Sequence, residues 1–280
     1  VRLGLASALL FDGIFQCRAH SGDSQNWKHW FDEYAVDPDG KATSSAAGLH
    51  WLGKSLAPAQ QRLRKLDSPN LLANAQWRLV IEKPALAAAD LQERDAVRTV
   101  SITRTGVGAP SLVALRASSD APLEPGTEYT FSFEARASTP RLVDLSFLTA
   151  EGSANAAKIF VPLYVRADWK RTVITCLCQS RRVLRHWELA LELGRDTGDV
   201  EFRNVSWQKG TGEIGWTREF ENGMAVVNPT RRPQSFADIG AFRKLLGRQD
   251  PKHNDGAPVK APLLVPPSDA FLLQRISATP

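Results

Sequence analysis

Between residues 67 and 210, apolar and polar positions alternate in short runs that Gly, Pro, Asp and Asn separate. In one such run, Tyr129, Phe131 and Phe133 share a phase, and polar residues occupy the other phase. Successive side chains of a strand point to opposite faces, so this run predicts a strand with one apolar and one polar face. About eight or nine such strands fit into the segment, which is the number expected for a jelly-roll β-sandwich.

The regions on either side of this segment have other patterns. The apolar start, residues 1–11, imitates a signal peptide, but Asp12 interrupts it and no small-residue cleavage site follows, so it predicts a helix. Asn222 and Gly223 stand between two apolar runs and predict a hairpin, and residues 263–274 predict a second one. We therefore expect three regions: 1–66, 67–210, and a small C-terminal β-domain at 211–280.

Composition supports packed cores and excludes some classes of partner. Hydrophobic residues make up 43% of the chain and aromatic residues 8%. The 35 basic and 30 acidic residues are interspersed, and the net charge of +5 forms no long tract of one sign, so we expect no nucleic-acid partner. No apolar run reaches the roughly 18 residues of a membrane span.

The three cysteines predict no disulfide framework. Three cysteines, Cys17, Cys176 and Cys178, cannot all pair, and the last two alternate along a predicted strand, a spacing that suits a mutual disulfide poorly. Their spacing does not indicate a zinc site either. We predict no cofactor.

Several elements of the central segment occur in an order and spacing that resemble a known family. They are residues 70–74 with Trp77, residues 123–126 before Tyr129, residues 168–170, residues 191–194 and residues 200–205. Together they resemble the carbohydrate-binding modules appended to bacterial cellulases and xylanases. The resemblance implies a jelly roll that binds polysaccharide. Members usually carry an aspartate in the last strand, where this chain has Arg203 and Asn204, so we predict no metal site.

The flanking regions resemble a different kind of protein. Residues 30–34, 52–59 and 218–229 are similar to stretches of uncharacterised bacterial glycoside hydrolases, in which a small β-domain follows a (β/α) barrel. The resemblance implies that residues 1–66 are the end of such a barrel and that the central module is an insertion. The sequence lacks an initiating methionine, so we expect it to be a piece of a longer polypeptide.

Asp32 and Glu33 are the candidate catalytic residues. Glycoside hydrolysis normally uses two carboxyl groups, and these two stand among aromatic residues, as carboxylates that contact sugars often do. Neighbours in a strand point to opposite faces, however, which argues against a pair formed by these two alone. Anchoring of a loop and hydrogen bonding to a substrate are the alternatives.

The polar phases of the central strands offer a candidate sugar-binding surface. Sugar hydroxyls need hydrogen-bonding partners, and the apolar faces of sugar rings stack on aromatic side chains. Phe160 and Tyr164 could supply the stacking platform, whereas Trp77, Trp169 and Trp187 have the phase of core residues. A solvated outer sheet face is the alternative. The candidate carbohydrate-binding residues are Glu134, Arg136, Asp144, Phe160, Tyr164, His186 and Glu188.

These observations predict a mainly β protein: a jelly-roll β-sandwich inserted between the end of a (β/α) barrel and a small C-terminal β-domain. The expected function is the carbohydrate-binding portion of a polysaccharide-acting glycoside hydrolase, secreted or associated with the cell envelope. Its expected partner is a polysaccharide or oligosaccharide. Most of the catalytic barrel would lie outside this chain. The alternative is a non-catalytic adhesion or scaffold protein that recognises glycan or protein.

Overall fold

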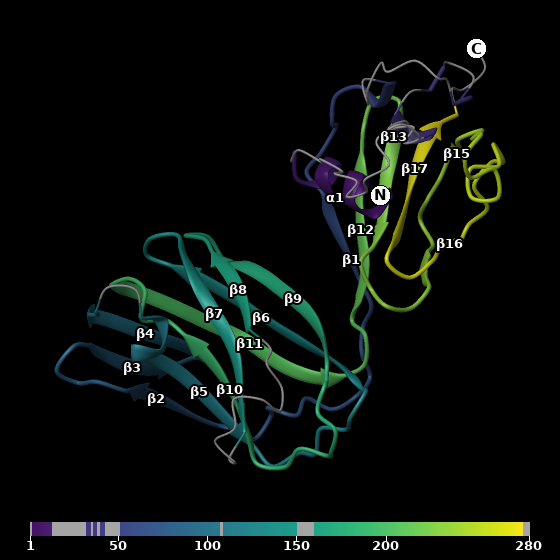
Figure 1. Ribbon diagram of the computed structural model, residues 1–280. Coiled ribbons are helices and arrows are strands. Elements are labelled where there is room, and N and C mark those ends of the chain that lie inside the picture. Colours follow the sequence, from purple (N-terminus) through teal and green to yellow (C-terminus); the bar gives the residue numbers. More distant parts are fainter. Residues whose placement is uncertain are drawn as a thin grey trace, which may run out of the picture. The chain divides into compact units, whose positions relative to one another are not determined.

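The computed structural model describes residues 2–12, 32–34, 36–37, 40–42, 51–106, 109–149 and 160–276. The chain divides into two compact units, which we call unit 1 and unit 2. Unit 1 comprises Val1–Arg64 and Glu213–Pro280, and unit 2 comprises Lys65–Gly212. Both are built mainly from β-strands (Figure 1).

The described residues of unit 2 form two five-stranded antiparallel sheets. The first, the β10 sheet, has the strand order β2 (Gln76–Ile81), β5 (Val113–Ser119), β10 (Trp187–Glu192), β7 (Arg141–Thr149) and β8 (Phe160–Val165). The second, the β6 sheet, has the order β3 (Ala88–Arg94), β4 (Val97–Arg104), β11 (Gly198–Lys209), β6 (Glu128–Ala137) and β9 (Lys170–Leu177). A short 3₁₀ turn, η3 (Pro110–Leu112), precedes β5.

The apolar phases of the two sheets meet in one core, which confirms the expected β-sandwich. Phe131 and Phe133 of β6 are buried as the alternation predicts, and Trp187 of β10 meets Trp207 of β11 with ring centroids 6.0 Å apart. Burial of each such ring stabilises the fold by about 2–3 kcal/mol. With their apolar phases occupied in this core, both sheets turn their polar phases outward, on opposite sides of the sandwich.

Unit 1 contains a five-stranded antiparallel sheet with the order β1 (Gln60–Leu63), β12 (Glu213–Glu219), β13 (Gly223–Asn228), β17 (Asp269–Arg275) and β15 (Phe242–Lys244). The helix α1 (Arg2–Leu10) packs on one face of this sheet, where Leu5 meets Ala225 and Val227 in one apolar cluster. The other face packs against the two-stranded sheet of β14 (Gln234–Phe236) and β16 (Leu263–Val265). The 3₁₀ turn η1 (Asp32–Tyr34) also belongs to this unit.

Two local predictions for unit 1 are confirmed and one is wrong. The apolar start forms the helix α1, and Asn222 and Gly223 stand at the turn of the β12–β13 hairpin. Residues 263–274 form no hairpin, because β16 pairs with β14 while β17 pairs with β13 and β15. The sequence pattern specifies strands here, but the choice of partner depends on residues distant in the chain.

The two flanks of the chain, expected as separate regions 1–66 and 211–280, contribute to the same sheet. Gln60 pairs with Thr217, and Leu63 pairs with Glu213, at the point where the chain enters and leaves unit 2. The end of a (β/α) barrel stays a prediction. Within the described ranges, no helix has the length and hydropathy needed to cross a bilayer.

Candidate functional site

The outward side of the β10 sheet carries a network of charged and polar side chains. Arg78 of β2 donates to Glu188 Oε1 of β10 at 2.5 Å, and Arg116 of β5 lies 3.8 Å from Glu188 Oε2. Arg116 also donates to Glu82 at 3.3 Å. Cross-strand neighbours of an antiparallel sheet lie within reach of each other, so the alternation along each strand produces this network. We call the network the polar face; its members are Arg78, Glu82, Arg116, Asp144, Ser146, Glu188, Glu192 and Arg195.

Asp144 of β7 is the most unusual member of the polar face. Its side chain is 0% exposed, although it belongs to the outward phase of its strand. Arg195 donates to Oδ2 through Nε at 2.9 Å and through Nη2 at 2.5 Å. Oδ1 has no hydrogen-bond partner in the described part of the chain, and the same is true of the buried Nε of Arg116. An unpartnered buried polar atom costs about 1–3 kcal/mol, and such atoms often mark the place of a ligand or an ordered water.

Neighbouring side chains extend the polar face towards one edge of the sheet. Ser146 donates to Glu192 Oε1 at 2.7 Å. On the edge strand β8, Tyr164 is 61% exposed while Leu163 and Val165 enter the core, so its ring is available on the outward side. Asp144 pairs in register with Pro162, two residues from Tyr164. An exposed aromatic ring thus lies on the same side of the sheet as the buried carboxylate.

Two more of the predicted binding residues belong to this sheet or its margin. Phe160 begins β8 opposite Ser146, and its side chain lies outside the described part of the structure. His186 immediately precedes β10, has a positive φ of 54°, and is exposed. Its Nδ1 lies 2.7 Å from Asp120 Oδ1. His186 therefore occupies the rim of the polar face.

Glu134 and Arg136 lie elsewhere, on the outward side of the β6 sheet. Glu134 accepts hydrogen bonds from Arg203 at 2.7 Å and from Asn204 at 3.1 Å, and the bond from Arg203 lowers the pKa of this carboxyl group. Arg136 donates to Glu201 at 2.9 Å. The predicted set thus divides between two opposite surfaces, because strand phase alone does not say to which sheet a strand belongs.

Of the tryptophans expected in the core, Trp187 is buried, and Trp77 is partly buried and packs against the core cluster. The prediction for Trp169 is wrong, since this residue stands just before β9 and is partly exposed. The guanidinium of Arg203 lies 4.2 Å from the centroid of its ring, and that of Arg136 lies 4.9 Å from it. These cation–π contacts cover the ring and explain its place at the surface.

Asp32 and Glu33 hold a loop of unit 1. Asp32 is 1% exposed and accepts hydrogen bonds from the backbone N–H groups of residues 248, 249 and 250 at 2.8–3.2 Å. Asn254 donates to Glu33 Oε1 at 3.0 Å. These contacts correspond to the loop-anchoring alternative. The assignment of Asp32 and Glu33 as a catalytic pair stays a prediction.

A charged cavity of about 570 Å³ adjoins these two carboxyl groups. Arg2 is its central cation: it donates to Asp269 and to Asp250 at 3.0 Å and lies 3.7 Å from Glu33 Oε1. Burial raises the pKa of Asp269, but the hydrogen bonds from Arg2 and the Ala270 N–H outweigh it and lower the pKa overall. Among the described residues, no group of three or more His, Cys, Asp or Glu side chains could hold a metal ion.

The sequence analysis missed the arginines of the polar face. Arg78 and Arg116 follow from the same alternation that identifies Glu188, since they occupy the outward phase of their strands. Arg195 follows a strand, in a turn, so no periodic signal marks it as a partner of Asp144. Such a contact depends on the fold.

No protein-family model and no curated protein matches this sequence. Among solved structures, a CBM4 structure is similar with 20% identity and a TM-score of 0.39, over 50% of this chain and 92% of the other. The second N-terminal cellulose-binding domain of a Cellulomonas fimi β-1,4-glucanase is similar with 16% identity and a TM-score of 0.40, over 56% and 99%.

A family 11 carbohydrate-binding module of a Clostridium thermocellum cellulosomal cellulase is also similar, with 10% identity and a TM-score of 0.34, over 54% of this chain and 96% of the other. The solved structures that resemble this chain thus include carbohydrate-binding modules. Identities and TM-scores are low, so the proposed function rests on the chain's own residues.

Proposed function

We propose that the polar face of unit 2 binds a polysaccharide or oligosaccharide. The observation that carries this proposal is the buried carboxylate of Asp144, whose Oδ1 lacks a partner among the described residues on the outward side of a sheet. A sugar hydroxyl can donate to such an oxygen, and it can accept from a guanidinium at the same time. The polar face offers both kinds of group beside each other.

The ion pairs of the polar face favour binding because they hold the side chains in place beforehand. Glu188 is fixed by Arg78, and Asp144 is fixed by Arg195. Less side-chain entropy is therefore lost when a ligand forms hydrogen bonds with them. Tyr164 adds an exposed ring, on which the apolar face of a sugar can stack. Both the polar and the apolar requirements of a sugar ring are met on one surface.

The wider setting follows from the sequence resemblance and belongs to the same proposal. We propose that unit 2 is a jelly-roll module inserted into a polysaccharide-acting glycoside hydrolase that is secreted or associated with the cell envelope. Asp32 and Glu33 would then belong to the hydrolase part, either as catalytic groups or as anchors of the loop that they bind. The binding experiment described next identifies the sugar and its linkage.

Affinity electrophoresis of the full chain in gels that contain soluble polysaccharides, together with a glycan array, tests the proposal. We expect retardation by at least one plant, bacterial or animal glycan. Absence of binding to all three classes would refute the carbohydrate-binding role. It would leave the adhesion or scaffold alternative, in which the partner is a protein.

A further inference from the structure

The margin of the polar face at β7 and β8 exposes three apolar side chains next to one another. Leu142 of β7 and Tyr164 of β8 are partners in register, and they are 42% and 61% exposed. Pro162 of β8, the partner of Asp144, is exposed as well. The residues that alternate with them along both strands enter the core, so all three lie on the outward side. We call Leu142, Pro162 and Tyr164 the apolar patch.

The apolar patch extends the surface on which a sugar ring can stack. The Cβ atoms of directly opposite residues in an antiparallel pair lie about 4.5–5.5 Å apart. A ring that stacks on Tyr164 therefore brings its substituents over Leu142 as well. Such a substituent loses its contact with water there and finds only apolar atoms of Leu142 and Pro162 in exchange.

Arg195 places a free hydrogen-bond donor beside this patch. Its Nε and Nη2 donate to Asp144 Oδ2, which leaves Nη1 without a partner in the described part of the chain. Nη1 is not one of the buried unpartnered atoms, and the side chain is 34% exposed, so solvent reaches this nitrogen. Asp144 follows Leu142 by two residues on the same face of β7, a separation of about 6.5–7 Å. The donor and the patch thus lie within reach of a single substituted sugar ring.

The turn that carries Arg195 is fixed on both sides. The N–H of Gly194 donates to the carbonyl oxygen of Pro110 at 2.8 Å, and a Cβ on this glycine would lie 2.8 Å from the same oxygen. On the other side, the buried guanidinium of Arg141 donates to the carbonyl oxygens of residues 196–197 at 3.2 and 2.7 Å. Arg195 is therefore held in place before a ligand arrives, which reduces the entropy lost on binding.

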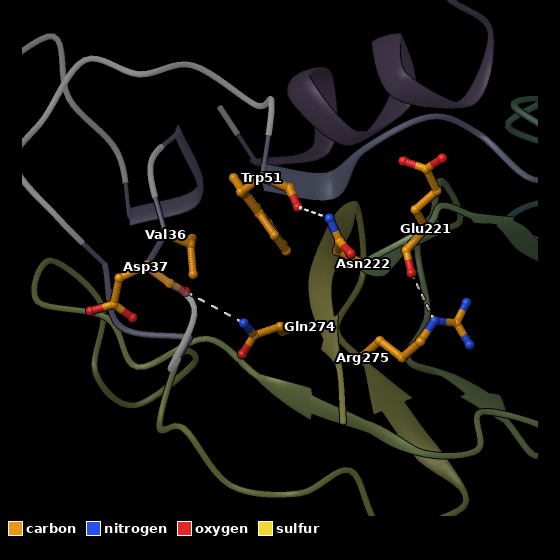
Figure 2. A pocket seen from close by; sticks show the side chains of 7 residues that line it. All are labelled: Val36, Asp37, Trp51, Glu221, Asn222, Gln274 and Arg275. Carbon is orange, nitrogen blue, oxygen red and sulfur yellow. Dashed lines mark hydrogen bonds between the residues drawn. The ribbon is translucent and has the colours of Figure 1, made fainter. Parts of the chain in front are cut away.

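The pocket beside Trp51 in unit 1, with a volume of about 450 Å³, shows the opposite use of polar groups. Figure 2 shows three of its polar side chains bonded to backbone carbonyl oxygens of the pocket's own walls. The bonds run from Asn222 to Trp51 at 3.0 Å, from Arg275 to Glu221 at 3.1 Å and from Gln274 to Asp37 at 3.5 Å. They join segments distant in the sequence and support the fold of unit 1, whereas Nη1 of Arg195 stays available to a ligand.

A donor next to an apolar patch matches a ligand group that combines an acceptor with a methyl group. A hydroxyl group over the patch would lose water without gaining a partner for its own proton, which costs free energy. A carboxylate gains little, because Asp144 already neutralises the guanidinium of Arg195 at 2.5 Å. An acetyl group has a carbonyl oxygen that accepts, a methyl group that prefers apolar surroundings, and no donor on either.

We propose that the polar face recognises an acetyl group on its saccharide. The methyl group packs on the apolar patch, and the carbonyl oxygen accepts a hydrogen bond from Arg195 Nη1. This inference rests on the proposed function and narrows its ligand to an acetylated polysaccharide. Burial of one methyl group strengthens binding about fourfold, and the hydrogen bond adds a factor of similar size, so acetylation should strengthen binding about tenfold.

Calorimetric titration of the full chain with matched pairs of ligands tests the proposal. O-acetyl groups are tested with acetylated xylan and acetylated glucomannan, each beside its alkali-deacetylated form. N-acetyl groups are tested with tetra-N-acetylchitotetraose beside cellotetraose, which carries a hydroxyl in place of each acetamido group. We expect the acetylated member of at least one pair to bind about tenfold more tightly than its partner.

Substitutions separate recognition of the acetyl group from binding in general. The readout is the ratio of the two affinities within a pair, because a general loss of binding lowers both alike. Leu142→Ser should lower this ratio about fourfold. Arg195→Lys keeps a cation beside the buried carboxylate of Asp144 but removes the free Nη1, so it should lower the ratio too. Leu264→Ser, at a 63% exposed position of β16, is the matched control and should leave the ratio unchanged.

The outcomes distinguish this inference from the proposed function. Acetylated members that bind no more tightly than their partners would overturn the inference, while binding of any glycan to the polar face leaves the proposed function standing. A preference for acetylated ligands that survives both Leu142→Ser and Arg195→Lys would also overturn it. Absence of binding to every glycan would refute both.

Discussion

Arg218 shows how one side chain ties unit 1 together. This arginine of β12 is 6% exposed and donates to the carbonyl oxygens of Leu9 and Leu10, where α1 ends, and to Asp12. We expect Arg218→Met to lower the free energy of unfolding of unit 1 by about 3 kcal/mol, because it leaves buried acceptors without a donor. Urea unfolding measures the change. Arg231→Met, at an exposed position of the same unit, should change the free energy of unfolding by less than about 0.5 kcal/mol. Equal effects of the two substitutions would contradict the role of Arg218.

His253 makes the stability of unit 1 depend on pH near neutrality. Burial, helped by Arg2, lowers the pKa of this imidazole from its ordinary value of 6.5, and its Nε2 lies 3.0 Å from the carbonyl oxygen of Ala270. Well above pH 6.5 the imidazole is neutral in both the folded and the unfolded chain. Below that pH the imidazole of the unfolded chain becomes protonated, whereas that of the folded chain stays neutral to a lower pH. Stability should therefore fall as the pH drops from 7 to 5. Urea titrations of His253→Gln should show a smaller fall, and an unchanged fall would refute this assignment.

Asn228 joins two sheets of unit 1 at the level of whole elements. This buried residue ends β13, and its Nδ2 donates to the carbonyl oxygens of Arg232, shortly before β14, and of Val265 and Pro266, at the end of β16. We expect Asn228→Ala to cost about 3 kcal/mol and to speed amide hydrogen exchange in β14 and β16. Ser235→Ala, at an exposed position of β14, is the matched control. Exchange that stays equally slow in both variants would contradict the linking role.

Elements that follow from the local sequence pattern were predictable, whereas the pairing of strands and the long-range contacts of side chains were not. Alternation identifies β6 with its buried Phe131 and Phe133, and the Asn222–Gly223 turn identifies the β12–β13 hairpin. Alternation also places Glu188 outward, but it cannot assign Glu134 to the opposite sheet. Asp32 accepts a hydrogen bond from the backbone N–H of Arg248, which lies 216 residues further along the chain. Only the folded structure therefore shows what Asp32 binds.

At the scale of the whole molecule, the paired strands β1 and β12 predict that unit 2 can be removed. Leu63 pairs with Glu213, so the two chain ends left after deletion of residues 64–212 lie opposite each other on neighbouring strands. An Asn-Gly linker should close them as a tight hairpin. We expect the joined flanks to fold cooperatively, as measured by circular dichroism and urea unfolding. A chain that remains unfolded would contradict the description of unit 2 as an insertion.

The central claim is that sugar binds to the polar face of the β10 sheet, and the opposite face of the sandwich offers a matched control. Glu188 and Glu201 each pair with an arginine, and their side chains are 24% and 22% exposed. Calorimetric titration of the polysaccharide that the wild-type chain binds should show at least a tenfold loss of affinity for Glu188→Ala and no change for Glu201→Ala. Loss for Glu201→Ala with normal binding by Glu188→Ala would place the site on the β6 sheet and contradict this account.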